Sequence, residues 1–261
     1  MLLENNLVWL EERLELRNIK AVIEYDGTNY KGFQIQPNVC TIQMVLEKAL
    51  ERLTKERIKI IAAGRTDTGV HALGQVINFY TASTIPVERF SQAINSCLPG
   101  DIRVLTAELA AENFHARYSA EWKIYRYLIR LGTSGGVFWR NYALTISDDL
   151  DLEAMREAAH HLVGTHDFQS FCASGCEVQS KVRSIKICDL RQIKSGIELE
   201  IKADGFLYHM VRNIVGTLLQ VGRGQRSPND MPRILASSDR NQAGPTAPPQ
   251  GLYLSEVGYP N

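Results

Sequence analysis

The sequence from Ala62 to Val76 reads AAGRTDTGVHALGQV and places one carboxylate, Asp67, among small and hydroxylated residues. An apolar run lies on each side, IKII at Ile58–Ile61 and VINFY at Val76–Tyr80. Apolar runs bounded by glycine are typical of strands, so the segment predicts a shaped loop between two strands. A loop of this kind can aim a single acid into a cleft while Arg65 and backbone N–H groups stabilise its charge.

Two other interpretations of Asp67 are open on the sequence alone. An aspartate followed by Thr-Gly is very often a plain turn residue. Aspartic proteases also contain Asp-Thr-Gly, but their chemistry needs two carboxylates that share a proton. The chain has no second Asp-Thr-Gly or Asp-Ser-Gly, and the polar Gly64-Arg65-Thr66 stands where an apolar strand end would be expected. A protease of this type would therefore need a homodimer to supply the second acid.

The longer string GRTDTGVHA, from Gly64 to Ala72, resembles the signature of the tRNA pseudouridine synthases of the TruA family, with only Thr68 at a variable position. A second segment, NIKAVIEYDGTNYKGFQIQ, begins at Asn18 and resembles the opening strand and loop of that family. The resemblance extends from about Asn18 to Pro260. It implies an isomerase that acts on uridine in tRNA.

Apolar periodicity predicts the strands and helices. The first part of the chain should contain strand Ile19–Tyr25, helix Thr41–Leu53, strands Ile58–Ala63 and Val76–Thr81, helix Pro86–Leu98 and strand Ile102–Leu109. The second part should contain strand Lys123–Arg130, helix Leu150–Val163, strands Val182–Ile193 and Ile197–Lys202, helices Tyr208–Val221 and Met231–Ala236, and strand Leu252–Val257. Both follow the βαββαβ order of ferredoxin-like and RRM-like domains, with one extra helix in the second. The predicted fold is α+β, with two such halves whose antiparallel mixed sheets are joined around a central cleft, as in the pseudouridine synthase fold.

The element order and the resemblance divide the chain into three parts. These are an N-terminal extension at residues 1–17, an N-terminal α/β half at 18–113 that carries the Asp67 loop, and a C-terminal α/β half at 114–261. Two long segments, Gly132–Asp149 and Ser237–Gly251, are rich in Gly, Ser, Pro and Asn. Segments of this kind either rim a functional cleft or are mobile, and the sequence leaves both open.

The composition of the chain excludes few classes of function. The chain of 261 residues has 29 Lys+Arg and 29 Asp+Glu, so a nucleic-acid surface would require basic residues gathered on one face. Its five cysteines lie in apolar segments, and the sequence shows neither a signal peptide nor an apolar run long enough to span a membrane. We therefore expect a cytoplasmic protein with free thiols and no membrane association.

The chemistry that the resemblance implies needs one carboxylate and no cofactor. Pseudouridine forms when the N1–C1′ bond breaks and C5 of the uracil joins C1′, and nothing is oxidised or added. The resemblance gives this role to Asp67. Three routes are open: the carboxylate attacks C1′ as a glycosidase nucleophile does, attacks the base, or takes a proton from C2′. Neither a nucleotide cofactor nor a metal is expected.

The resemblance also implies the residues around the acid. Tyr125, in WKIYRYLI, matches a cleft tyrosine that would hold the flipped base, and Leu252, in GLYL, matches an apolar residue of the base pocket; both would otherwise be core residues. Arg212, on an apolar helix, is expected to pair with Asp67, unless it extends to the surface. Arg65 should bind phosphate or help to extrude the base.

Basic residues that could bind the RNA backbone are scattered along the chain, and no single one is assigned. The candidates are Lys31, Arg117, Lys123, Arg126, Arg130, Lys181 and Arg183. A group of sulfur and imidazole side chains could hold zinc, but its spacing is unspecific and no metal is expected. That group contains Cys172, Cys176, His160, His161 and His166.

The resemblance implies a specific substrate and assembly. The substrate is the anticodon stem and loop of tRNA, at the conventional positions 38, 39 and 40, and the enzyme is a homodimer. The alternative is a catalytically inactive RNA-binding protein with two RRM-like halves. RRM aromatic signatures are missing from the predicted strands, and an intact GRTDTG string argues against loss of activity.

Overall fold

The N-terminal part of the fold is two helices on an antiparallel group of strands. A computed structural model describes residues 16–132, 136–175 and 178–260. Its first elements are β1 (Arg17–Tyr25), α1 (Ile42–Thr54), β2 (Ile61–Ala62), β3 (His71–Thr81), α2 (Val87–Asn95) and β4 (Ile102–Leu109). Helix α1 begins where the Thr41 hydroxyl accepts a hydrogen bond from the backbone N–H of Met44, and it buries the apolar side that its spacing predicts. Strand β2 is shorter than the expected Ile58–Ala63.

The C-terminal part repeats helices on strands with additional short elements. They are β5 (Trp122–Leu131), α3 (Gly136–Trp139), β6 (Leu144–Ile146), α4 (Leu152–His160), β7 (Gly164–Asp167), β8 (Val182–Ile193), β9 (Gly196–Ala203), α5 (Met210–Gly222), α6 (Asp230–Ser237) and β10 (Leu252–Gly258). Elements α3, β6 and β7 were not predicted. Strand β6 is three residues long and pairs in parallel with the C-terminal end of β5. A strand this short is too brief to show an apolar period, so the sequence did not predict it.

Strand β10 joins the two parts of the molecule. It pairs antiparallel with β5 and parallel with β3, where Tyr253 lies opposite His71 and Leu254 opposite Ala72. The described strands therefore form one mixed sheet in the order β4-β1-β3-β10-β5-β9-β8-β7, with β2 on β3 and β6 on β5. The predicted α+β class with a mixed sheet is confirmed, but the sheets are continuous rather than separate.

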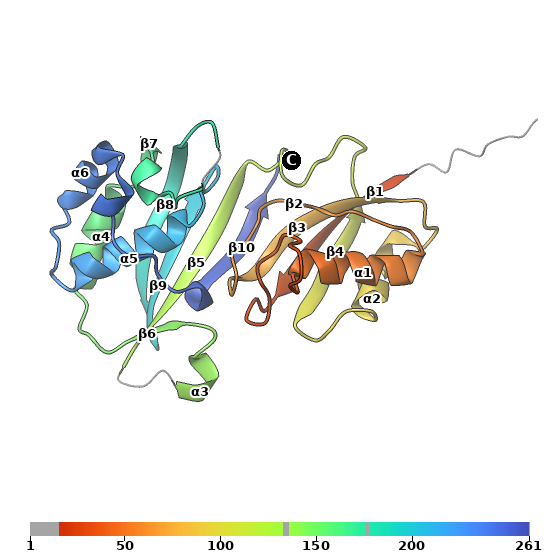
Figure 1. The fold of residues 1–261 in the computed structure, drawn as a ribbon, viewed down its shortest axis with the longest axis horizontal. Coiled ribbons are helices and arrows are strands. Elements are labelled where there is room, and N and C mark those ends of the chain that lie inside the picture. Colours follow the sequence, from red (N-terminus) through yellow and green to blue (C-terminus); the bar gives the residue numbers. More distant parts are fainter. Residues whose placement is uncertain (1–15, 133–135, 176–177, 261) are drawn as a thin grey trace, which may run out of the picture.

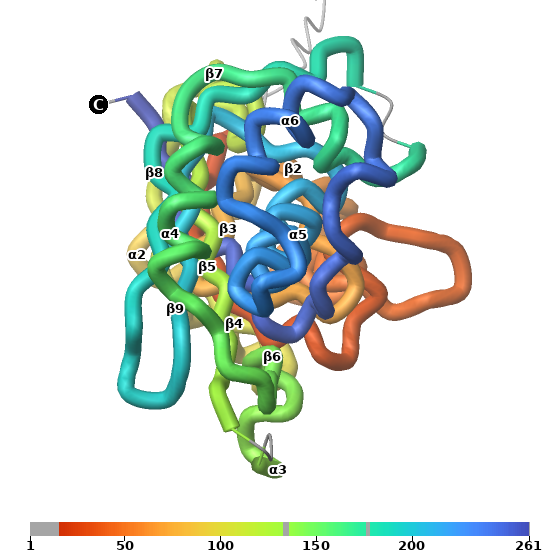
Figure 2. Tube along the Cα trace, turned by 90° about the vertical axis from the view of Figure 1, so that its left-hand side faces the viewer, coloured from red at the N-terminus to blue at the C-terminus, as the bar shows by residue number. Residues whose placement is uncertain are grey.

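The helices leave a gap above the middle of this sheet. In Figure 1, α1 and α2 lie over the N-terminal strands on the right, and α4, α5 and α6 lie over the C-terminal strands on the left. Figure 2 shows the same arrangement from the side, with α5 close to the strands. Close contact at the junction requires glycine at position 74, because a Cβ there would lie 2.5 Å from the carbonyl oxygen of Ser255.

Three remaining expectations meet different outcomes. The proposed extension at residues 1–17 lies mostly outside the described residues, but Arg17 already belongs to β1. Cys40, Cys97 and Cys188 are free thiols, whereas Cys172 is disulfide-bonded, so the expectation of free thiols is wrong at Cys172. Across residues 16–132, 136–175 and 178–260, no helix is long and apolar enough to cross a membrane.

Candidate functional site

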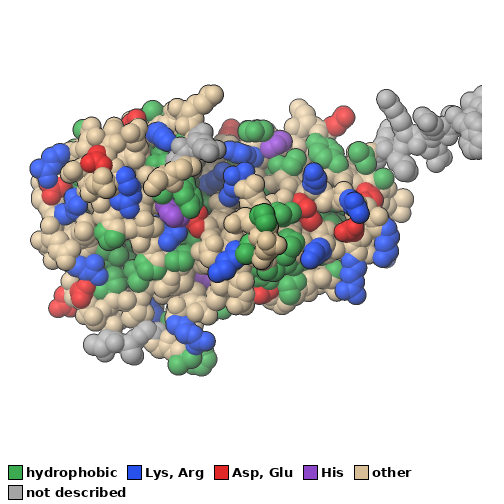
Figure 3. Space-filling model, in the orientation of Figure 1, with side chains coloured by type: hydrophobic (Ala, Val, Ile, Leu, Met, Phe, Trp, Pro, Cys, Tyr) green, Lys and Arg blue, Asp and Glu red, His purple; other side chains and the backbone are tan. Residues whose placement is uncertain are grey.

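A groove of about 1290 Å³ lies between the two parts and is lined by both. It gathers all the side chains that the sequence singled out for the site: Arg65, Asp67, Tyr125, Arg212 and Leu252. In Figure 3, Lys and Arg side chains surround a hollow in the middle of the face shown. Residues separated by more than a hundred positions thus converge because β10 and β5 lie side by side at the centre of the sheet.

The loop that carries Asp67 is held rigidly from below. The Thr66 hydroxyl and the Tyr25 hydroxyl are 2.7 Å apart in a buried hydrogen bond, and the Thr66 carbonyl accepts from the backbone N–H of Phe33 at 3.0 Å. Gly69 has a φ of 76°, a conformation that favours glycine. The Asp67 side chain is 22% exposed and lies in the wall of the groove. Asp67 therefore does lie in a turn, as one of the alternative interpretations held, and this turn directs its carboxylate to the groove.

Two basic side chains approach the same oxygen of Asp67. Arg212 Nη1 lies 3.1 Å from Oδ2, and His209 Nε2 lies 3.4 Å from the same atom. Arg212 is fixed in turn, because its Nε donates to the carbonyl oxygen of Ala247 at 2.7 Å and its side chain is only 13% exposed. Within the described parts of the chain, no hydrogen bond or ion pair reaches Oδ1 of Asp67. One carboxylate oxygen is therefore held, and the other is free to react.

His209 is a site residue that the sequence reasoning missed. It precedes α5 with a φ of 60°, a left-handed conformation that is uncommon outside glycine. Burial lowers the pKa of its imidazole, the charge of Asp67 opposes that shift, and Arg212 and Arg240 add to it. The neutral imidazole has one N–H, and the tautomer with the proton on Nε2 directs it at Asp67. The spacing of His209 and Arg212, three residues apart, was the available signal.

Tyr125 is both buried and part of the groove wall. It is 8% exposed, and its ring meets the ring of Phe206 edge to face at a centroid distance of 5.0 Å. Its hydroxyl has no hydrogen-bond partner among the described residues, and burial, followed by the nearby Tyr25 and Asp67, raises its pKa. A buried ring with an unpaired hydroxyl on a groove is suited to a ligand more than to a core.

The other two predicted residues, Leu252 and Arg65, also line the groove. Leu252 is the first residue of β10, is 5% exposed, and pairs with Tyr127 of β5. Arg65 is exposed, and no carboxylate lies within ion-pair distance of it in the described part of the chain. An apolar contact and a free guanidinium thus flank the acid.

Of the seven candidate basic residues, three line the groove and four do not. Lys31, Arg117 and Lys123 line the groove. Arg126 is paired with Glu200 at 3.0 Å, and Arg130 lies over the ring of Trp139, so both have partners elsewhere. Lys181 and Arg183 do not line the groove, although Arg183 is close enough to Lys123 to affect its pKa.

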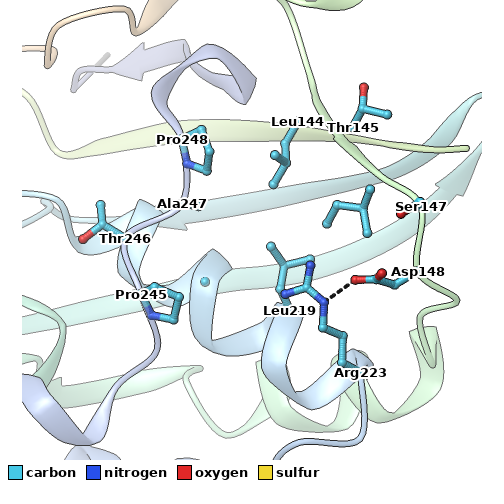
Figure 4. Close-up of a pocket in the computed structure, with 12 residues that line it drawn as sticks. Leu144, Thr145, Ser147, Asp148, Leu219, Arg223, Pro245, Thr246, Ala247 and Pro248 are labelled. Carbon is cyan, nitrogen blue, oxygen red and sulfur yellow. Dashed lines mark hydrogen bonds and ion pairs between the residues drawn. The ribbon is translucent and has the colours of Figure 1, made fainter. Parts of the chain in front are cut away.

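A second cavity of about 300 Å³ lies beside α5, and none of the predicted site residues line it. Figure 4 shows that Arg223 and Asp148 meet across it, with their atoms Nε and Oδ2 2.6 Å apart. Ala247 and Pro248 form part of its wall, so it lies behind the segment that fixes Arg212. Its charged groups are paired with each other, and it lacks the free acid of the larger groove.

Among the described residues, no three His, Cys, Asp or Glu side chains are placed to hold a metal ion. Cys176, one member of the Cys/His group considered from the sequence, lies outside those residues.

Comparison with known proteins finds related sequences over most of the chain. The sequence profile of a family described as tRNA pseudouridine synthase matches residues 21–119 and 158–260. A tRNA pseudouridine synthase A of Bacillus pumilus (strain SAFR-032) is 50% identical over 245 residues, covering 93% of this chain and 99% of that protein. Proteins of the same name from Syntrophomonas wolfei and Bacillus subtilis (strain 168) are 51% and 50% identical over 245 residues, covering 94% and 93% of this chain and 98% and 99% of theirs. A solved archaeal box H/ACA sRNP structure overlaps with a TM-score of 0.36 at 10% identity, over 77% of this chain and 44% of that one.

Proposed function

The chain belongs to the tRNA pseudouridine synthase family, and from this premise we propose how its groove acts and on which part of tRNA. The enzyme is an isomerase that converts uridine to pseudouridine in tRNA. We propose that its targets are uridines 38, 39 and 40 in the anticodon stem and loop, flipped into the groove, with Asp67 as the nucleophile. The convergence of Arg212 and His209 on one oxygen of Asp67 is the observation that carries the proposal.

The contacts of Asp67 suit a carboxylate that reacts through Oδ1. Arg212 donates to Oδ2 and His209 Nε2 lies 3.4 Å from the same atom, so both lie on one side of the carboxylate without covering the other oxygen. In attack on C1′, Oδ1 forms a bond to carbon as the N1–C1′ bond breaks, and the uracil leaves as an anion. After the base turns, C5 displaces the carboxylate from C1′, the C5 proton leaves and N1 takes a proton. A free Oδ1 would equally serve attack on the base or removal of the C2′ proton.

Tyr125 and Leu252 would hold the base while it turns. Their side chains give the groove an apolar wall beside the acid, and the uracil ring can stack on an aromatic side chain. Burial raises the pKa of the Tyr125 hydroxyl, so the hydroxyl stays protonated and would relay the C5 proton, taking it up while passing its own proton to solvent. Exposed Arg65 would bind a phosphate or occupy the space that the extruded base leaves in the RNA.

The proposal extends to the assembly of the protein. We infer that the two parts of the chain, residues 18–113 and 114–261, are ferredoxin-like halves, which the repeated helix-on-strand arrangement supports. A cytoplasmic homodimer that contacts one tRNA with both subunits is the expected working form. Size-exclusion chromatography with light scattering tests the dimer directly.

The decisive experiment follows the C5 proton. The full chain is incubated with unmodified tRNA that carries tritium on C5 of uridine, and tritium release is measured together with the position of pseudouridine. The wild type should release tritium from positions 38, 39 and 40, and Asp67→Asn should release none while binding tRNA within a few fold of wild type. Substantial turnover by Asp67→Asn would remove the carboxylate from the mechanism. A wild type that binds but never releases tritium would support the inactive RNA-binding alternative.

A further inference from the structure

Lys123 carries a charge that no side chain nearby neutralises. It lies on β5, is half-buried, and its ammonium donates to the carbonyl oxygen of Ala63 at 2.7 Å. In the parts of the chain that the structure describes, no carboxylate lies within ion-pair distance of Lys123. A lysine withdrawn from water is rarely left without a counter-ion, because the desolvation of its charge is not offset.

Two further cations stand close to Lys123. Burial, followed by the charges of Arg117 and Arg183, lowers the pKa of Lys123 to about 8. Neither arginine has a carboxylate partner among the described residues. The three side chains come from three places in the fold: β5, the turn before it, and the start of β8. An anion bound between them would relieve their mutual repulsion.

Both arginines are held in place by their surroundings. The turn of Arg117 is closed by His115, whose Nδ1 accepts from the backbone N–H groups of Arg117 and Tyr118 at 3.2 Å each. Arg183 donates from Nη1 to the carbonyl oxygen of Ser180 at 3.0 Å, and it lies against Gly205. These contacts order the turn that carries Arg117 and hold the Arg183 side chain, and they neutralise neither guanidinium group.

The remaining neighbours of Lys123 do not supply an anion. Its partners on the adjacent strands, Ala203 and Val257, are uncharged. The loop after β2 offers only backbone and the cation Arg65, while Asp67 in that loop is engaged by Arg212. Glycine at position 64 allows the loop to approach, since a Cβ there would lie 3.3 Å from the Lys123 ammonium. Asp204, which follows Ala203, accepts from the backbone N–H of Ser184 at 3.0 Å, and among the described residues it forms no ion pair with Lys123 or Arg183.

We propose that Lys123, Arg117 and Arg183 bind a phosphodiester group of the RNA backbone next to the nucleotide that is isomerised. This rests on the proposed function, because it takes tRNA as the occupant of the groove. A phosphodiester carries a full negative charge on two oxygens, which suits one ammonium and two forked guanidinium groups. The phosphates on both sides of a flipped nucleotide must leave the helical path with it, so at least one of them enters the groove.

The placement links this phosphate to the reacting base. Lys123 and Tyr125 are two residues apart on β5, so they project to the same side of the sheet. On the other side, Gly64 beside the Lys123 ammonium is three residues before Asp67. A phosphate held here fixes the sugar between the acid and the tyrosine, which is where C1′ must lie for reaction.

The site has a pH signature whose sign follows from linkage. A bound phosphate favours the charged ammonium, so the pKa of Lys123 rises above its free value of about 8 when RNA binds. Below about pH 8 the ammonium is present in both states, and affinity should not depend on its titration. Above that pH the free protein must take up a proton to bind, so affinity falls by up to about tenfold per pH unit.

The test measures the Kd for unmodified tRNA from pH 7 to 9.5 and at several salt concentrations, with the full chain. Lys123→Arg keeps a charge that does not titrate in this range; it should bind like wild type at pH 7 and lose the extra fall at high pH. Lys123→Met should bind at least about tenfold more weakly at pH 7, with a salt slope smaller by about 1. Lys194→Met, in the exposed turn between β8 and β9, is the matched control and should behave like wild type.

Two results would overturn the phosphate site. One is an identical pH dependence for wild type and Lys123→Arg; the other is an unchanged Kd and salt slope for Lys123→Met with an unchanged Tm. Pseudouridine formation by the wild type is scored separately. If the pH-dependent binding holds but no pseudouridine forms, the proposed reaction is wrong and the phosphate site stands.

Discussion

At the scale of single residues, the two oxygens of Asp67 differ. Oδ2 lies within 3.1 Å of Arg212 and 3.4 Å of His209, and these two side chains stand three residues apart at the start of α5. A carboxylate held on one side keeps a fixed orientation, and its lone pairs on the other side point at whatever enters the groove. His209 achieves this in a left-handed backbone conformation, which a β-branched residue would not tolerate.

We predict that His209 acts through its N–H and not through the backbone. His209→Gly adopts the same φ without strain but removes the donor, so single-turnover isomerisation should slow by roughly 10- to 100-fold, the effect of one hydrogen bond to a charged group. His209→Asn tolerates the conformation and keeps an amide donor, so it should recover part of the rate. His160→Gln, on α4 away from the groove, is the control. Equal rates for the glycine variant and wild type would assign the left-handed turn alone to His209.

The same residue predicts an acid limb in the pH profile. The pKa of His209 is lowered, mainly by burial, so the imidazole is neutral at neutral pH and gains a proton only as pH falls below its ordinary range. The imidazolium would pair tightly with Asp67 and weaken its nucleophilicity, so the rate should fall on acidification. In His209→Asn this limb should disappear or move to lower pH. A limb of unchanged position in that variant would show that another group titrates.

Substitutions of Tyr125 can distinguish two roles of a tyrosine in the groove, stacking on the uracil and removal of a proton. Stacking on the uracil is worth about 1–3 kcal/mol, whereas removal of a proton in the chemical step is worth roughly 10²–10⁴ in rate. Because the hydroxyl has no partner among the described residues, we expect Tyr125→Phe to be slowed severely in single-turnover assays with little change in tRNA affinity. Tyr125→Leu should fail in both respects. If only the leucine variant fails, the ring is a stacking surface and water takes the proton.

At the scale of elements, α5 and the segment from Ala243 to Pro248 act as a pair. The backbone N–H of Ala247 donates to the carbonyl oxygen of Arg212, and Arg212 Nε donates back to Ala247. Further along α5, Asn213 accepts from Thr246 and Arg240, and Thr217 accepts from Gly244. The long segment Ser237–Gly251, for which the sequence left two roles open, therefore braces the helix that carries the site.

A single methyl group between these elements should disturb the site at a distance. A Cβ on Gly216 would lie 1.7 Å from the carbonyl oxygen of Pro245, so Gly216→Ala must push the segment away from α5. We expect a loss of about 1–3 kcal/mol in the free energy of unfolding and a fall in kcat as Arg212 loosens. Gly100→Ala, which has open space around it, should change stability by less than about 0.5 kcal/mol. Thermal unfolding and tritium release measure both variants, and a Gly216→Ala enzyme with wild-type stability would refute the packing argument.

At the scale of the whole molecule, the last strand in the sequence is central in space. Strand β10 connects β5 to β3, so the two parts share one sheet and the groove has one rigid floor. The opposite end of the chain is peripheral: β1 begins at Arg17, whose guanidinium donates to the carbonyl oxygens of Ser83 and Ile85 and lies over the ring of Phe90.

This difference predicts where N-terminal truncation begins to matter. Removal of residues 1–15 should leave Tm and isomerase activity near wild type, because β1 begins at Arg17 and the family match begins at residue 21. Removal of residues 1–17 deletes Arg17 with its two hydrogen bonds and its contact with the ring of Phe90, so Tm should fall by several degrees. Insoluble protein after the shorter deletion would show that residues 1–15 stabilise the body.

The amino-acid sequence by itself determined the local secondary structure and the identity of the candidate site residues. Helix α1 followed from the spacing of its apolar side, and Asp67 followed from a contiguous string, because both signals lie within a few neighbouring residues. Tyr125, Arg212 and Leu252 required the resemblance to a family, since nothing in their own surroundings distinguishes them from core or surface residues. All five predicted site residues do line one groove.

Only the tertiary structure decided what depends on contacts between distant segments. The parallel pairing of β10 with β3 and the isolation of Lys123 from any described carboxylate are relations in space between residues far apart in sequence. Likewise, the seven candidate basic residues look alike in the sequence. Lys123 differs from Arg126 because it is more buried and because no acid among the described residues pairs with it, whereas Arg126 pairs with Glu200. Periodicity reports which side of an element is apolar, but it does not report which other element covers that side.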